Sequence, residues 1–158
     1  MQEQRTDTSL KSKIEQMLTE ARVIIPGAQA LLGFQLIAVL TRSFNELPVA
    51  FKYAHCVALS AVTLSVILLM TPAALHRIGF PGEDDPAFFA IGSRFVVAGS
   101  VPLAVGIAAD VAVVFFKAIG NESVAMAAGL VSLLALLGLW IGFPFWLRKS
   151  RTEGMLKT

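Results

Sequence analysis

Long apolar segments without charged residues dominate the pattern of this chain. Residues 23–40, 54–71 and 124–147 contain no Lys, Arg, Asp or Glu, and residues 86–118 contain only three such side chains. A helix needs about 20 apolar residues to cross the hydrocarbon core of a bilayer. The pattern therefore predicts four membrane-spanning helices over these ranges.

Proline residues predict where these helices begin and bend. The second helix should continue past Pro72 to about Ile78, because "TPAALHRIGF" is compatible with a helix. Asp85 followed by Pro86 predicts an N-cap and a first-turn proline, so the third helix should begin there. Three prolines are expected to bend their helices: Pro26, Pro72 and Pro102.

The polar N-terminal segment has a helical periodicity of its own. Between Leu10 and Ile25, apolar residues recur at spacings of three and four, with charged residues on the other side. This predicts an amphipathic helix over residues 1–22 that lies along the cytoplasmic membrane surface or packs on a partner subunit. The expected fold is all-α and polytopic: an interfacial helix (1–22), a domain of four transmembrane helices (23–147) and a basic tail (148–158).

Composition agrees with an integral membrane protein and argues against several kinds of site. Of the 158 residues, 56% are hydrophobic and 15% are charged, and the mean hydropathy is +0.72. The single cysteine, Cys56, excludes an internal disulfide and a CxxC pair. His55 and His76 lie about 30 Å apart along one helix, too far to share a metal. We therefore expect no metal, no cofactor and no nucleic-acid partner.

The distribution of basic residues predicts the orientation. Ten of the 13 Lys and Arg residues lie in the N-terminal segment, in the C-terminal tail, or beside the loop between the second and third spans. Loops rich in Lys and Arg stay in the cytoplasm. Both termini are therefore expected to be cytoplasmic.

Asp110 lies in the middle of an apolar span. Ala98, Pro102, Gly106 and Asp110 recur every four residues on the third helix and so share one face. A charged aspartate that faces lipid costs several kcal/mol, so Asp110 should face protein. Two interpretations remain open: a hydrogen bond between helices near the outer headgroups, or an ion or proton site.

Height along the helices suggests which groups Asp110 could meet. Arg42, at the outer end of the first span, can reach down and is the favoured partner, with Lys117 as the alternative. Gln35 lies close in height to Asp110, whereas Gln29 lies about a turn and a half lower. Glutamines in membrane helices more often join helices than bind ligands. The expected polar core is Asp110, Gln35, Gln29 and Arg42.

A second polar group is expected near the inner membrane surface. Four basic side chains should gather there at one level: Arg22, His76, Arg77 and Arg94. They fit either the positive-inside rule with snorkelling side chains or a site for an anionic lipid headgroup. Glu83, Asp84 and Asp85 in the adjacent loop could neutralise part of this charge.

Small residues on the fourth span offer surfaces for close helix packing. Gly138 and Gly142 form a GxxxG motif, and Ala125 with Gly129 forms a weaker version. A single chain of four helices has little room for a transport pathway and its gates. These surfaces therefore favour a homo-oligomer.

Three stretches resemble a bacterial family of small four-helix integral membrane proteins of unknown function: "TEARVIIPGAQALLGFQL", "TPAALHRIGF" and "IGSRFVVAGSVPLAVGIAAD". Some members of that family carry a sodium:proton antiporter label. The resemblance covers residues 18–114 and implies a multi-pass protein of the bacterial cytoplasmic (inner) membrane. The residues that it singles out are Glu20, Arg22, Pro26, Gly27, Gln29, Phe34, Gln35, Pro72, His76, Arg77, Arg94, Pro102, Gly106 and Asp110.

The sequence contains no phosphate-binding glycine loop, nucleophile elbow, HExxH motif or paired carboxylates, so we expect that the protein is not an enzyme. The polar residues in the spans favour a small oligomeric membrane protein that conducts or exchanges protons or small cations. The alternative is a structural or accessory membrane protein that transports nothing and binds anionic lipids.

Overall fold

Helices account for nearly all of the chain. The computed structural model describes residues 2–80 and 85–155, with side chains for 10–80 and 85–152, and contains no strand over those ranges. The elements are α1 (Gln2–Val39), α2 (Arg42–Asn45), α3 (Val49–Gly79), α4 (Pro86–Ile119), α5 (Glu122–Leu137), a π-helical turn (Gly138–Gly142) and α6 (Phe143–Met155). The all-α prediction is confirmed.

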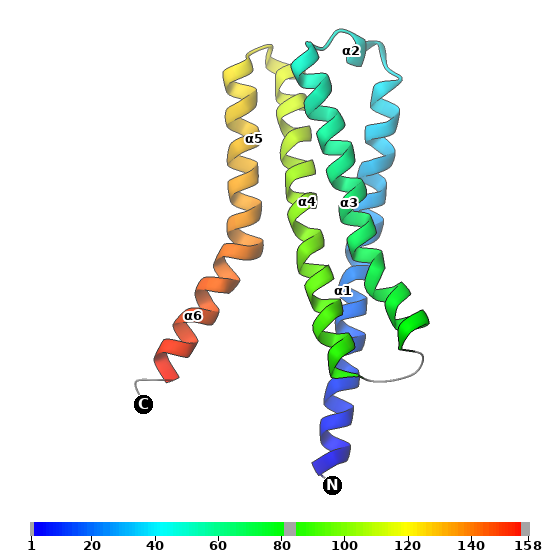
Figure 1. Cartoon of the computed structure of the whole chain (residues 1–158). Helices are drawn as coiled ribbons and strands as arrows, with labels where there is room; N and C mark the ends of the chain where they lie inside the picture. Colours follow the sequence, from blue (N-terminus) through cyan, green and yellow to red (C-terminus); the bar gives the residue numbers. More distant parts are fainter. Residues whose placement is uncertain (1, 81–84, 156–158) are drawn as a thin grey trace.

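Four helical segments are long and apolar enough to cross a membrane, as the hydrophobic pattern predicts. They are Leu10–Val39, Val49–Gly79, Pro86–Ile119 and Glu122–Thr152. Figure 1 shows α1, α3 and α4 side by side, with α5 packed along α4 and α6 leaning away from the other helices. Both termini lie at one end of the molecule, and α2 lies at the other.

The N-terminal amphipathic segment and the first span form one continuous helix, α1. Its periodicity is as predicted, but its apolar side contacts protein. Ile14 and Met17 are buried in a cluster with Phe88, near the start of α4. Because α3 and α4 extend beside this part of α1, they cover a face that we expected either to lie in the lipid headgroups or to pack on a partner subunit. Pro26 lies within α1 without ending it.

Glycines on α4 let the neighbouring helices approach closely. A Cβ added at Gly106 would lie 2.5 Å from Val62 Cγ2 of α3, and one at Gly99 would lie 2.9 Å from Leu69 Cγ. Small residues at such positions allow helix backbones to pack tightly in a membrane. This contact aligns α3 with α4 and determines which side chains from the two helices meet.

The weaker of the two small-residue motifs on the fourth span makes the helix contact. A Cβ at Gly129 would lie 2.9 Å from Ala112 Cβ and 3.0 Å from the Ala108 carbonyl oxygen, so α5 packs closely on α4 there. By contrast, a Cβ at Gly138 would meet nothing within 4 Å. Gly138 and Gly142 instead bound the π-helical turn that leads into α6.

Candidate functional site

Three helices each contribute one polar side chain to a cluster inside the bundle. Gln35 of α1 donates a hydrogen bond from Nε2 to Asp110 Oδ2 of α4, at 2.6 Å. His55 of α3 places Nδ1 3.5 Å from Asp110 Oδ1. The other ring nitrogen of His55, Nε2, lies 3.0 Å from the backbone oxygen of Gln35. We call Gln35, His55 and Asp110 the polar cluster.

The polar cluster lies toward the end of the bundle that carries α2. Gln35 is four residues from the end of α1, His55 six from the start of α3 and Asp110 nine from the end of α4. At 1.5 Å per residue, these positions are about 6, 9 and 14 Å from the respective helix ends. All three residues lie within segments that are apolar enough to span a membrane.

The cluster is largely shielded from its surroundings. Gln35 is 3% exposed and His55 is 4% exposed, and the Asp110 side chain is 18% exposed. Gln35 Oε1 is buried, with no hydrogen-bond partner in the described part of the chain. The cluster therefore contains one buried acceptor with unused hydrogen-bonding capacity beside a carboxyl group.

The contacts of His55 determine where its protons lie. A backbone carbonyl only accepts hydrogen bonds, so the ring nitrogen Nε2 beside Gln35 must carry a hydrogen. Nδ1 then faces the Asp110 carboxyl group. Without a further proton, a nitrogen lone pair and a carboxylate oxygen would face each other in a buried setting. One proton between His55 and Asp110 would remove this repulsion, so the geometry favours a proton shared by the two groups.

The segment around α2 covers the cluster at that end. The ring of Phe44 meets the ring of His55 edge-on, with centroids 5.1 Å apart. Leu47 and Phe51 are buried beside it in an apolar group that also includes Val113. These residues separate the His55 ring from the surface at the α2 end.

An ion pair ties this cover to α4. Lys117 Nζ donates a hydrogen bond to Glu46 Oε2 at 2.8 Å. The Lys117 ammonium group holds the pKa of Glu46 below its ordinary value of 4.5. Both side chains are well exposed, so the pair adds little to overall stability. Its effect is local, because it connects the α2–α3 loop with the last turn of α4.

Asp110 faces protein, as expected, and Gln35 contacts it. The prediction that Arg42 is its cationic partner was wrong. Arg42 is exposed at the first position of α2, and the alternative partner, Lys117, pairs with Glu46. Sequence spacing gives height along a helix but not its rotation, and α1 ends at Val39, before Arg42. Gln29 is exposed and makes no part of the cluster.

His55 is the functional candidate that the sequence analysis missed. We had considered it only as a metal ligand, paired with His76. A signal was present, because His55 lies in an otherwise apolar span and at a height comparable with Asp110. Among the described residues, no group of three or more His, Cys, Asp or Glu side chains is placed to hold a metal.

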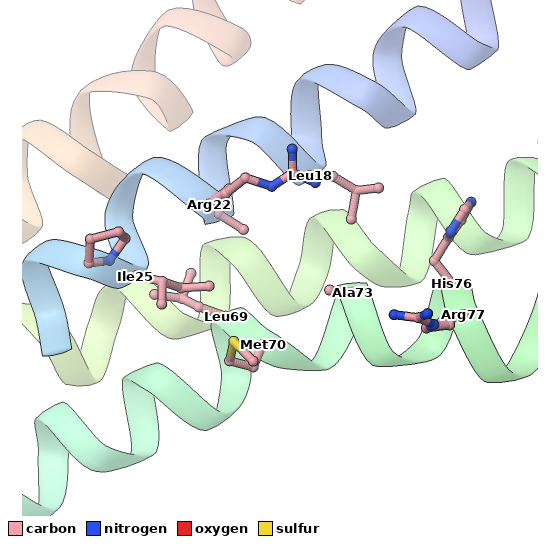
Figure 2. Close-up of a pocket in the computed structure, with 10 residues that line it drawn as sticks. Leu18, Arg22, Ile25, Leu69, Met70, Ala73, His76 and Arg77 are labelled. Atoms are coloured by element: carbon pink, nitrogen blue, oxygen red, sulfur yellow. The ribbon is translucent and has the colours of Figure 1, made fainter.

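Three of the four basic residues predicted near the inner surface line one pocket, which lies between α1 and the last turns of α3. The pocket has a volume of about 640 Å³ and is lined by Leu18, Ala21, Arg22, Ile25, Pro26, Leu69, Met70, Ala73, His76 and Arg77. Figure 2 shows Ile25, Leu69 and Met70 toward one end of it and His76 and Arg77 toward the other. We call it the inner pocket. Arg94 is exposed on α4 and is not among its lining residues.

The acidic segment between α3 and α4 is described only in part. Glu83 and Asp84 lie outside the described residues. Asp85 accepts a hydrogen bond from the Ala87 backbone nitrogen at 2.6 Å and so caps α4, as predicted. Asp85 therefore has a structural contact of its own.

Comparison with known proteins places the chain in a family. A family model described as "Family of unknown function (DUF6328)" matches residues 2–144. The chain belongs to this family. No curated protein and no solved structure matches the sequence significantly.

Membership of DUF6328 confirms the expected relationship to a family of unknown function. The match is broader than the resemblance in the sequence, which covers residues 18–114, because it also includes α5 and the π-helical turn. In this DUF6328 protein, the polar cluster and the inner pocket both lie within the matched range.

Proposed function

We propose that the protein conducts or exchanges protons or small cations across the membrane, with His55 and Asp110 as its proton-binding pair. The observation that supports this most strongly is the contact between His55 Nδ1 and Asp110 Oδ1, 3.5 Å apart on two different helices. One proton between the two groups would stabilise this contact, and both groups can bind it. Ionisable residues inside membrane spans commonly belong to proton or ion pathways.

A small cation could replace the proton at the same place. When the shared proton leaves, Asp110 remains as a carboxylate close to the amide of Gln35, whose Oε1 lacks a hydrogen-bond partner among the described groups. Small hard cations prefer carboxylate and amide oxygens as ligands. A proton and a cation would then compete for one site, which is the basis of exchange.

In this proposal the protein acts as a homo-oligomer in the bacterial inner membrane, with both termini in the cytoplasm, and is not an enzyme. Two features support the homo-oligomer. Among the described residues, the side chains of the polar cluster come from α1, α3 and α4, and α5 packs mainly on α4. A pathway on both sides of Asp110 is more easily completed by neighbouring subunits than within one such bundle.

Proton flux into vesicles tests this proposal. The full-length protein, reconstituted in vesicles that contain a pH-sensitive dye, should equilibrate an imposed pH gradient faster than empty vesicles do. Asp110→Asn keeps the shape of the side chain but cannot release a proton, so its flux should fall to that of empty vesicles. His55→Gln should also reduce flux, whereas Gln29→Ala, on an exposed position of α1, should not.

Parallel measurements with a sodium or potassium gradient identify the coupled ion. Folding of each variant is checked by circular dichroism and size-exclusion chromatography. Well-folded wild-type protein without flux under any of these gradients would overturn the transport proposal. The accessory role would then remain, for which the inner pocket provides a separate observation.

A further inference from the structure

The inner pocket has positive charge toward one end and apolar surface toward the other, which matches the headgroup and the acyl chains of an anionic membrane lipid. We propose that it binds an anionic phospholipid, with the phosphate group at Arg22, His76 and Arg77 and part of an acyl chain against Ile25, Leu69 and Met70. The volume of about 640 Å³ lies in the range of small-molecule binding sites. This site is separate from the polar cluster and does not depend on the proposed transport.

The charges in the pocket suit a phosphate group. Arg22 comes from α1 and Arg77 from α3, so two helices contribute guanidinium groups to one space, and His76 of α3 adds a ring N–H donor. None of the ten described lining residues is acidic. Guanidinium groups bind phosphate oxygens through paired hydrogen bonds. The ring of His76 also packs against Phe88 of α4, with centroids 4.9 Å apart, which restrains its orientation.

The apolar part of the pocket continues in the direction of the bilayer centre. On α3, Leu69 precedes His76 by seven residues, which corresponds to about 10 Å along the helix. On α1, Ile25 likewise follows Arg22 in the direction away from the N-terminus. Figure 2 shows Ile25, Leu69 and Met70 toward one end of the pocket, His76 and Arg77 toward the other, and Arg22 between them. A free phosphate ion would use only one end of this pocket, whereas a phospholipid would use both.

A site of this kind differs from a general excess of positive charge at the inner surface. Arg22, Arg77 and Arg94 are all exposed and should lie at a similar depth, but Arg94 is on α4 and outside the pocket. If only the positive-inside rule were at work, Arg22, Arg77 and Arg94 would be equivalent for lipid binding. Arg94→Gln is therefore a matched control that removes the same charge elsewhere.

Native mass spectrometry tests the proposal with the full chain in detergent and equal amounts of phosphatidylglycerol and phosphatidylcholine with identical acyl chains. We expect retention of phosphatidylglycerol in at least about tenfold excess, which corresponds to about 1.4 kcal/mol. Arg22→Gln combined with Arg77→Gln should bring the ratio close to one. Arg94→Gln and Asp110→Asn should leave it unchanged.

Two further measurements complete the test. Arg22→Lys combined with Arg77→Lys keeps the charge, so it should fold and retain part of the preference even if the glutamine variant misfolds. Millimolar inorganic phosphate should not displace the bound lipid. Equal retention of both lipids, an equal loss in Arg94→Gln, or displacement by phosphate alone would overturn the assignment to an anionic lipid.

Discussion

His55 Nδ1 lies 3.5 Å from Asp110 Oδ1, while Nε2 of the same ring lies 3.0 Å from the Gln35 backbone oxygen. The imidazole therefore connects α1 and α4 through α3. Because the Gln35 carbonyl uses one ring N–H, a second proton would be needed for a hydrogen bond between His55 and Asp110. Gain or loss of that proton alters the contact between His55 of α3 and Asp110 of α4. Protonation and helix packing are therefore linked at this pair.

A double-mutant cycle should detect this link. Asp110→Asn and His55→Gln should each destabilise the protein, and the double variant should lose less than their sum, with a coupling energy of about 0.5–3 kcal/mol. Thermal unfolding in detergent measures these changes. Arg42 is exposed and makes no contact with Asp110, so Arg42→Gln combined with Asp110→Asn should be additive. Coupling to Arg42 instead of His55 would contradict the arrangement.

Substitution of Gly106 should disturb the contact between α3 and α4. In Gly106→Ala, the new Cβ would lie 2.5 Å from Val62 Cγ2 and 3.2 Å from the Ala58 carbonyl oxygen. Such overpacking costs about 1–3 kcal/mol of stability. Gly138→Ala is the control, because its Cβ would meet nothing within 4 Å. Equal unfolding temperatures for the two variants would show that the close approach at Gly106 is incorrect.

The ion pair between Glu46 and Lys117 should persist in mildly acidic solution. Lys117 lowers the pKa of Glu46, so the contribution of the pair is complete above the ordinary value of 4.5 and disappears as the pH falls through the lowered pKa. An NMR titration of the Glu46 carboxyl carbon measures this midpoint. It should rise toward the ordinary value in Lys117→Gln and at high salt. A titration midpoint that stays the same in Lys117→Gln and at high salt would argue against the ion pair.

Orientation in the membrane can be measured with fused reporters. The excess of basic residues at the end with the termini predicts that a reporter fused after Thr158 is cytoplasmic. A reporter inserted within residues 45–48, beside α2, should be external. The opposite result would mean that the protein has the reverse orientation, with the inner pocket on the outer side of the membrane.

The sequence alone predicted four membrane-spanning helices and the start of α4 at Pro86, but not the continuity of α1, the short helix α2 or the π-helical turn that leads into α6. This was possible because a membrane span requires a long apolar run, and polar or helix-ending residues bound each run. The expectation that Asp110 faces protein also followed, since exposure of a carboxylate to lipid is costly. These properties depend on one segment and its solvent, so local sequence is enough to infer them.

Only the tertiary structure decided which residues meet. Asp110 contacts His55 rather than Arg42, Gly129 rather than Gly138 makes the contact with α4, and Met17 packs against α4 rather than lying in headgroups. Each outcome depends on the rotation and relative height of two helices that are distant in the sequence. In a lipid environment apolar attraction does not select among such arrangements, so close packing of small residues and a few polar contacts do.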